Sequence, residues 1–157
     1  MRSAMSIRMK VAFWCHLLAL LLIAIIGLIY LFRSQFMPYH AIAVGKNWAE
    51  VDPAFQILLL ALIRVVGGAW IAAALAMGIL LFVPFRQGMR WARRAVPTIG
   101  LVAELPALYA TLSVTLNTPA TPPWKGVVLI MLLLVAGLIL SLEPEKKIEH
   151  VVDRSHA

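Results

Sequence analysis

Charged residues are scarce in this chain of 157 residues, and acidic ones are scarcest. Asp and Glu together number seven, against fourteen Lys and Arg. Charged side chains make up 13% of the sequence and hydrophobic ones 62%, which is not the composition of a soluble globular domain. We therefore predict one integral membrane domain, with no room for a soluble catalytic one.

Cysteine and histidine are nearly absent as well. Cys15 is the only cysteine, which excludes an internal disulfide and a dithiol redox pair. Of four histidines only His16 falls in an apolar segment, while His40, His150 and His156 fall in a loop and the tail. A bis-histidine haem needs two histidines at one depth, and no set has metal-ligand spacing, so we expect no cofactor and no metal. Hydrolase motifs, phosphate loops and paired carboxylates are also missing, which makes an enzyme the less favoured class.

Four long apolar segments dominate what is present. They cover residues 11–32, 54–83, 95–116 and 124–142, followed by a short polar tail at 143–157. Each is long enough to cross the ~30 Å hydrocarbon core as a helix. The first exceeds the ~7–15 apolar residues of a secretory signal, so we expect it to be retained. Short loops make neighbours antiparallel, and we predict an all-α, up-down four-helix bundle in a single domain, 1–157.

The basic residues sort by side of the membrane. Three lie in loops on one side (Arg33, Lys46 and Lys125), and ten on the other. By the positive-inside rule both termini are cytoplasmic, and we predict a multi-pass protein of the cell inner membrane. The net charge of +7 then reflects orientation in the membrane rather than binding of nucleic acid. The ten are Arg2, Arg8, Lys10, Arg86, Arg90, Arg93, Arg94, Lys146, Lys147 and Arg154.

Four arginines lie close together in the second loop, which joins the second and third apolar segments. Arg86, Arg90, Arg93 and Arg94 follow i, i+4, i+7, i+8 spacing, which would place them on one face of a helix. Such a stripe suits anionic lipid headgroups, at about 1 kcal/mol per residue. A more specific lipid or acidic-partner site is the alternative.

Two opposite charges interrupt the apolar segments. Arg64 lies in the second and Glu104 in the third, each at a cost of roughly 2.5–3.5 kcal/mol on insertion scales. Counted from Pro53 and Asn117 at the outer ends, their depths are ~16 and ~20 Å. We therefore predict that the two side chains pair in the membrane.

Other polar side chains share the faces of this pair. Gln56 lies on the face of Arg64, Thr111 on that of Glu104, and Tyr109 nearby. One interpretation is a buried salt bridge that fixes helix register. The other is a mid-membrane polar site for a proton, an anion, a quinone or a lipid headgroup.

Small residues in the second segment indicate close helix packing. Gly67, Gly68 and Ala72 include a small-xxx-small pattern, which lets another helix approach. The loop at 33–52 precedes this helix and contains three aromatic residues, Phe36, Tyr39 and Trp48, together with Met37. We expect it to fold over the outer mouth of the bundle.

Three stretches resemble small four-helix bacterial membrane proteins of the broad DoxX-like type. They are LIRVVGG at 62–68, FRQGMRWA at 85–92 and TPATPPW at 118–124. The resemblance implies a four-helix bundle with an arginine–glycine helix crossing. In this sequence the crossing would be formed by Arg64, Gly67 and Gly68. Some members of such families are thought to be subunits of membrane oxidoreductase or redox-protection assemblies. The long aromatic loop at 33–52 departs from their shorter pattern, and the resemblance carries over no catalytic residue.

From these features we expect a non-enzymatic inner-membrane protein, either an accessory subunit or an orphan bundle. Its expected partners are membrane lipids and a larger membrane protein complex. The alternative is a small transporter, or a lipid- or quinone-binding protein, that uses the same polar site.

Overall fold

The computed structural model describes residues 5–142, which form helices, turns and loops and no strand. Four long helices cross the molecule: α1 (Ile7–Phe32), α3 (Pro53–Leu80), α4 (Arg90–Asn117) and α5 (Trp124–Ser141). Each is long and apolar enough to span a membrane, so the chain is a multi-pass membrane protein. The predicted all-α four-helix fold is confirmed. The predicted tail at 143–157 and Arg2 lie outside the described residues.

Three short elements complete the fold. The loop after α1 contains α2 (Pro38–Val44) and the 3₁₀ turn η1 (Trp48–Glu50). At its other end α3 continues as a π-helical turn, η2 (Leu81–Phe85), with Pro84 inside it. A proline leaves one backbone acceptor without its donor, and a π turn accommodates this local change in the ladder. Together α3 and η2 form a rod of 33 residues.

Helix ends follow local capping chemistry. Asp52 accepts hydrogen bonds from the backbone N–H groups of Ala54 (2.8 Å) and Phe55 (3.4 Å), so α3 begins directly after it at Pro53. The Ser6 side chain accepts from the Met9 N–H at 3.3 Å. As a result α1 begins at residue 7, four residues before the predicted start.

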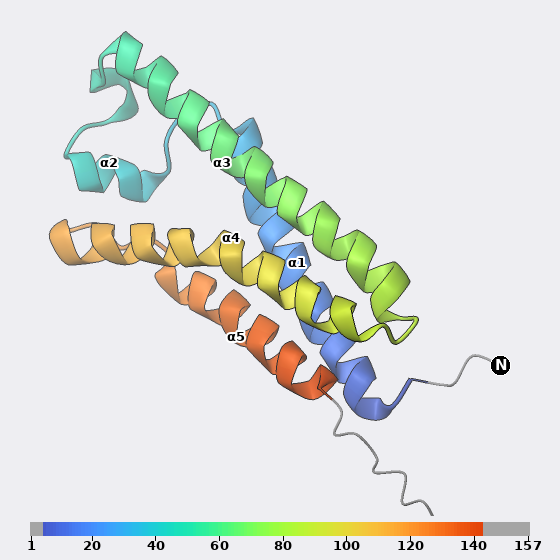
Figure 1. The fold of residues 1–157 in the computed structure, drawn as a ribbon. Coiled ribbons are helices and arrows are strands. Elements are labelled where there is room, and N and C mark those ends of the chain that lie inside the picture. Colours follow the sequence, from blue (N-terminus) through green and yellow to red (C-terminus); the bar gives the residue numbers. More distant parts are fainter. Residues whose placement is uncertain (1–4, 143–157) are drawn as a thin grey trace, which may run out of the picture.

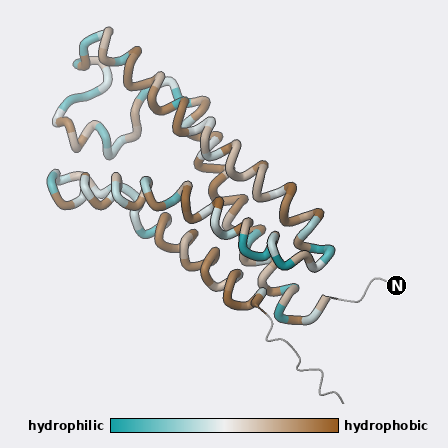
Figure 2. Tube along the Cα trace, viewed as in Figure 1, coloured by the Kyte–Doolittle hydropathy of each residue, from teal (hydrophilic) through white to brown (hydrophobic). Residues whose placement is uncertain are grey.

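The helices form a ring in which each packs on two neighbours. α1 contacts α3 and α5, and α4 contacts the same two helices from the opposite side. α1 begins and α5 ends at one end of the bundle, here called the terminal end, and α2 lies at the other, the loop end (Figure 1). Apolar residues run along all four helices, and hydrophilic ones gather at the loops and turns (Figure 2). The core is built mainly from small and branched side chains, including Ala19, Ile23, Ala74, Ile130 and Leu134, together with Met77.

Two close contacts fix how the helices are aligned. A β-carbon on Gly67 would lie 2.6 Å from the Leu31 backbone nitrogen and 2.8 Å from the Gly27 carbonyl oxygen, so α1 and α3 touch through their main chains. A β-carbon on Gly100 of α4 would meet Leu134 of α5 at 2.7 Å and Met77 of α3 at 3.2 Å.

The three predicted packing residues behave differently from one another. Gly67 lies at the crossing of α1 and α3, as the sequence indicates. A β-carbon on Gly68 would meet no atom within 4 Å, and Ala72 is exposed. The prediction of close packing at Gly68 and Ala72 is therefore wrong, because the face of α3 that meets α1 is the one that carries Gly67.

Candidate functional site

Glu104 is the acidic side chain buried in the bundle core. It projects from α4 one turn beyond Gly100 and is 1% exposed. Within residues 5–142 its carboxyl group has no hydrogen bond and no ion pair. An isolated carboxylate in apolar surroundings is costly, so this group is the main candidate for a functional role inside the bundle.

Arg64 does not pair with Glu104, and the predicted ion pair is wrong. Arg64 is exposed on α3, thirteen residues from Met77, whereas Glu104 lies four residues from Gly100. Because Met77 and Gly100 are in contact, the two charges are offset by about nine residues, or ~14 Å along the bundle. The prediction assumed that Pro53 marks the edge of the membrane, but α3 begins well beyond the end of α1.

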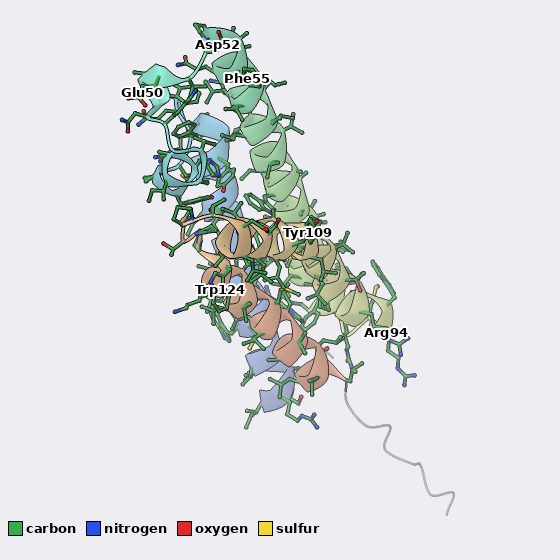
Figure 3. All side chains as sticks on the ribbon, turned by 90° about the vertical axis from the view of Figure 1, so that its left-hand side faces the viewer. Glu50, Asp52, Phe55, Arg94, Tyr109 and Trp124 are labelled. Atoms are coloured by element: carbon green, nitrogen blue, oxygen red, sulfur yellow. The ribbon has the colours of Figure 1, made fainter. Side chains whose placement is uncertain are left out.

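The remaining members of the predicted polar site are also dispersed. Gln56 donates from Nε2 to the carbonyl oxygens of Trp48 (2.8 Å) and Val51 (3.1 Å), which ties η1 to the start of α3. The Thr111 hydroxyl donates to carbonyl oxygens of the preceding turn of α4, at 2.8 and 3.1 Å. Tyr109 is 76% exposed and lies on the outside of α4 (Figure 3). The five predicted residues therefore form no common site.

His16 is the buried titratable side chain that our sequence reasoning did not assign to the site. It is 0% exposed, and neither ring nitrogen has a hydrogen-bond partner in the described part of the chain. The ring stands edge-on to Phe85 of η2, with centroids 5.7 Å apart. It also lies over Gly137 of α5, where a β-carbon would be 2.5 Å from the His16 Cε1 atom. The sequence does carry a signal for this buried residue, because His16 is the one histidine inside an apolar run.

The second-loop arginines form only part of the predicted stripe, since α4 carries Arg90, Arg93 and Arg94 at i, i+3 and i+4 and Arg86 lies before it. Gly88 has a φ of 81°, so the chain turns there and α4 begins only at Arg90. Arg93 donates from Nη1 to the Ser141 carbonyl oxygen at 3.2 Å, at the end of α5. This bond caps the last turn of a helix, where a cation is favoured. Headgroup binding remains a prediction for the three exposed arginines, Arg86, Arg90 and Arg94.

An aromatic cluster organises the loop end. Phe36 is buried and stands edge-on to Trp48, with centroids 4.9 Å apart, and the hydroxyls of Tyr30 and Tyr39 are hydrogen-bonded. Burial, and then this hydrogen bond, raise the pKa of Tyr39, which keeps its phenol protonated. Burial lowers the pKa of His40, and the nearby positive charge of Arg33 lowers it further.

Across residues 5–142, no three His, Cys, Asp or Glu side chains are grouped so that they could hold a metal ion. No protein-family model, curated protein or solved structure matches this chain.

Proposed function

We propose that the chain is a non-enzymatic subunit of a larger membrane assembly, and that it binds its partner through the loop-end part of α3. The observation that carries this proposal is the length of α3. From the contact of Gly27 with Gly67, α1 continues for five residues and ends at Phe32. The same distance along α3 reaches Leu62, so the nine residues at 53–61 extend about 14 Å past the end of α1.

This extension is apolar where a helix leaving the lipid would be expected to be polar. Phe55, Ile57 and Leu58 are all exposed, Ile57 by 73%. Phe55 lies beside Asp52 and Glu50 at this extremity of the molecule (Figure 3). With the end of α1 taken as the edge of the lipid, this exposed apolar surface lies outside the membrane, where it favours a protein partner.

Arg64 lies on the same side of α3 as this apolar surface. It follows Ile57 by seven residues, which places the two on one helical face, next to the exposed Val65. Arg64 is level with the last turn of α1, near the boundary between lipid and water. An acidic or polar group of the partner at that level would pair with the guanidinium.

A transporter or a quinone-binding protein is less well supported. Glu104 is 1% exposed, so very little of its side chain is accessible to a ligand in this conformation. A relationship to DoxX-like proteins would agree with a role as an assembly subunit, and it stays a prediction.

Site-specific photocrosslinking in the native membrane tests the proposal. A benzoylphenylalanine at Ile57 should give one discrete protein adduct, and Arg64→Gln should lower its yield several-fold. The matched control is the same group at Leu132, which is 61% exposed on α5 and should react with lipid alone. The proposal would be overturned if the probe at position 57 reacted with lipid and with no protein. An adduct with the mass of two copies of this chain would also overturn it.

We also propose that the terminal end faces the cytoplasm of a cell whose inner membrane holds the protein. Most basic side chains in the described part lie at that end, which supports this orientation. In a Cys15→Ala background, an impermeant thiol reagent should label a cysteine at Lys46 in spheroplasts. It should label one at Gln87 only after the membrane is opened, and the reverse pattern would contradict the orientation.

A further inference from the structure

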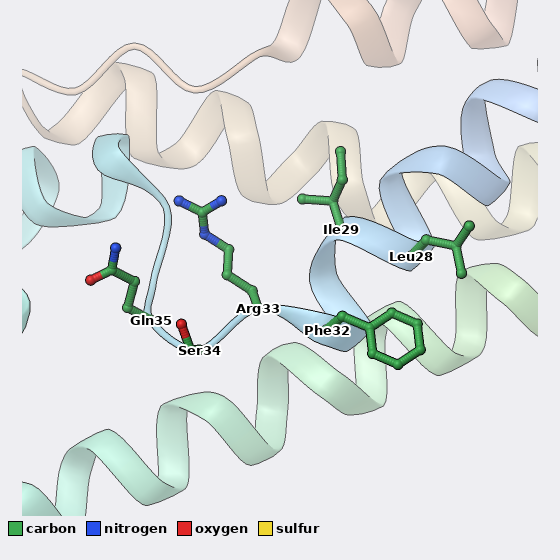
Figure 4. A pocket seen from close by; sticks show the side chains of 6 residues that line it. All are labelled: Leu28, Ile29, Phe32, Arg33, Ser34 and Gln35. Carbon is green, nitrogen blue, oxygen red and sulfur yellow. The ribbon is translucent and has the colours of Figure 1, made fainter.

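An open hollow of about 390 Å³ lies where α1 ends at the loop end. Its apolar wall is formed by Leu28, Ile29 and Phe32, and its polar wall by the three residues that follow, Arg33, Ser34 and Gln35. Figure 4 shows the Arg33 and Ile29 side chains extending to the same side of the chain, with Ser34 and Gln35 next along the loop. The hollow therefore has an apolar and a cationic part side by side.

Arg33 has no counterion in the described part of the chain. Its Nε atom is buried and makes no hydrogen bond. The two acidic residues of the loop end are already engaged. Glu50 accepts from the Asn47 backbone N–H at 2.9 Å, and Asp52 caps α3 through the Ala54 N–H at 2.8 Å.

The titratable neighbours of Arg33 do not supply a negative charge either. The raised pKa of Tyr39 keeps its hydroxyl protonated, and the lowered pKa of His40 keeps its imidazole neutral. His40 Nδ1 accepts a hydrogen bond from the Met37 backbone N–H at 3.3 Å, which requires the unprotonated nitrogen. The positive charge in this hollow is thus left for an anion from outside the chain.

The apolar wall continues down the outside of α1. Leu18, Leu21, Ile25, Leu28 and Phe32 are all exposed and are spaced by three, four, three and four residues, which places them on one face. This strip ends at Arg33. An alkyl chain could therefore lie along the strip while its headgroup reaches the guanidinium.

We propose that this hollow binds an anionic phospholipid of the leaflet at the loop end, with its phosphate on Arg33. Ser34 and Gln35 offer further hydrogen-bond donors to the headgroup, and one acyl chain lies along the apolar strip of α1. Arginine suits this role because its guanidinium donates two parallel hydrogen bonds to a phosphate.

Native mass spectrometry of the full chain in detergent provides the test, with dioleoylphosphatidylglycerol and dioleoylphosphatidylcholine as probes. We expect one tightly bound phosphatidylglycerol, and Arg33→Gln should weaken it about tenfold or more, as loss of a charge-assisted contact does. The matched control, Lys46→Gln, removes the same charge from an exposed site on the same loop and should leave this binding unchanged. Ile29→Trp, which fills the hollow without changing charge, should also weaken binding.

Three results would overturn the proposal. Equal weakening by Arg33→Gln and Lys46→Gln would indicate diffuse attraction by net charge. Displacement of the lipid by millimolar inorganic phosphate, with no effect of Ile29→Trp, would indicate a site for a free anion. Equal retention of both lipids by the parent chain would remove the need for an anionic headgroup. Circular dichroism of each variant establishes that it is folded.

Discussion

Gly27 and Gly67 meet main chain to main chain where α1 crosses α3. A β-carbon on Gly27 would lie 3.1 Å from the Gly67 carbonyl oxygen, and one on Gly67 would lie 2.8 Å from the Gly27 carbonyl oxygen. Two neighbouring backbones cannot yield as a flexible side chain can. This crossing therefore fixes the register of α1 against α3, and with it the length of α3 that extends at the loop end.

Gly67→Ala should destabilise the bundle by about 1–3 kcal/mol, because the added methyl group forces α1 and α3 apart. Gly68→Ala is the matched control, since its β-carbon enters open space and its effect should be neutral or slightly stabilising. Thermal unfolding in one detergent measures both. Equal effects of the two substitutions would contradict the main-chain contact.

A double-mutant cycle on Arg64 and Glu104 should show almost no coupling. The two charges are offset by ~14 Å along the bundle, so Arg64→Gln and Glu104→Gln should add to within about 0.5 kcal/mol. Glu104→Leu should leave stability unchanged or raise it, because it removes a buried carboxyl group that has no partner. A coupling free energy above about 1 kcal/mol in equilibrium unfolding would instead support the predicted ion pair.

Gly137→Ala should cost about 1–3 kcal/mol, because its methyl group would occupy the space of the His16 ring. His16→Ala empties that space, so the double variant should lose at least ~1 kcal/mol less than the two single variants added together. Gly126→Ala of α5 serves as the control, since nothing lies within 4 Å of its β-carbon. Strict additivity of the first pair would show that the ring does not pack on Gly137.

Arg93→Gln should destabilise the end of α5 by about 1–2 kcal/mol, through loss of the bond to the Ser141 carbonyl oxygen. Arg94→Gln removes the same charge from an exposed neighbour and should change stability by less than ~0.5 kcal/mol. Hydrogen exchange of the segment 138–142 reports the local effect. Faster exchange in both variants alike would assign the effect to net charge.

Lowering the pH should loosen α2. Because the pKa of His40 is below its ordinary value of 6.5 in the folded chain, the folded state binds fewer protons than the open one. Stability from this group is therefore present above pH 6.5 and is lost as the pH falls below it. Exchange of the amides at 37–44, corrected for intrinsic rates, should accelerate between pH 7.5 and 5.5. His40→Gln should abolish this pH dependence, and its persistence would exclude His40 as the cause.

The helices and the crossing residue were predictable because their signals are local. Long apolar runs predict the spans, Asp52 before Pro53 predicts the start of α3, and Gly67 predicts a close approach. Each depends only on neighbours in the sequence.

The polar site was not predictable because it depends on helix register. Depths counted from helix ends assume that all helices enter the membrane at one plane, but α3 begins nine residues past the end of α1. Because of this offset, Arg64 lies nearer the loop end than Glu104, and Glu104 has no charged partner among residues 5–142. The contact of His16 with Gly137 joins residues 121 positions apart, across two helices whose alignment no local pattern specifies. Gly88 did carry a local signal, since a glycine in a loop favours a turn over the helix assumed for the arginine stripe.

The unequal lengths of the helices have a consequence for the surrounding lipid. α5 has 18 residues and spans about 27 Å, whereas α3 with η2 has 33 and spans about 50 Å. A bilayer with a 30 Å core must thin slightly beside α5, and it has no need to do so beside α3. The two flanks of the protein thus favour acyl chains of different length, and short-chain lipids should gather on the α5 side.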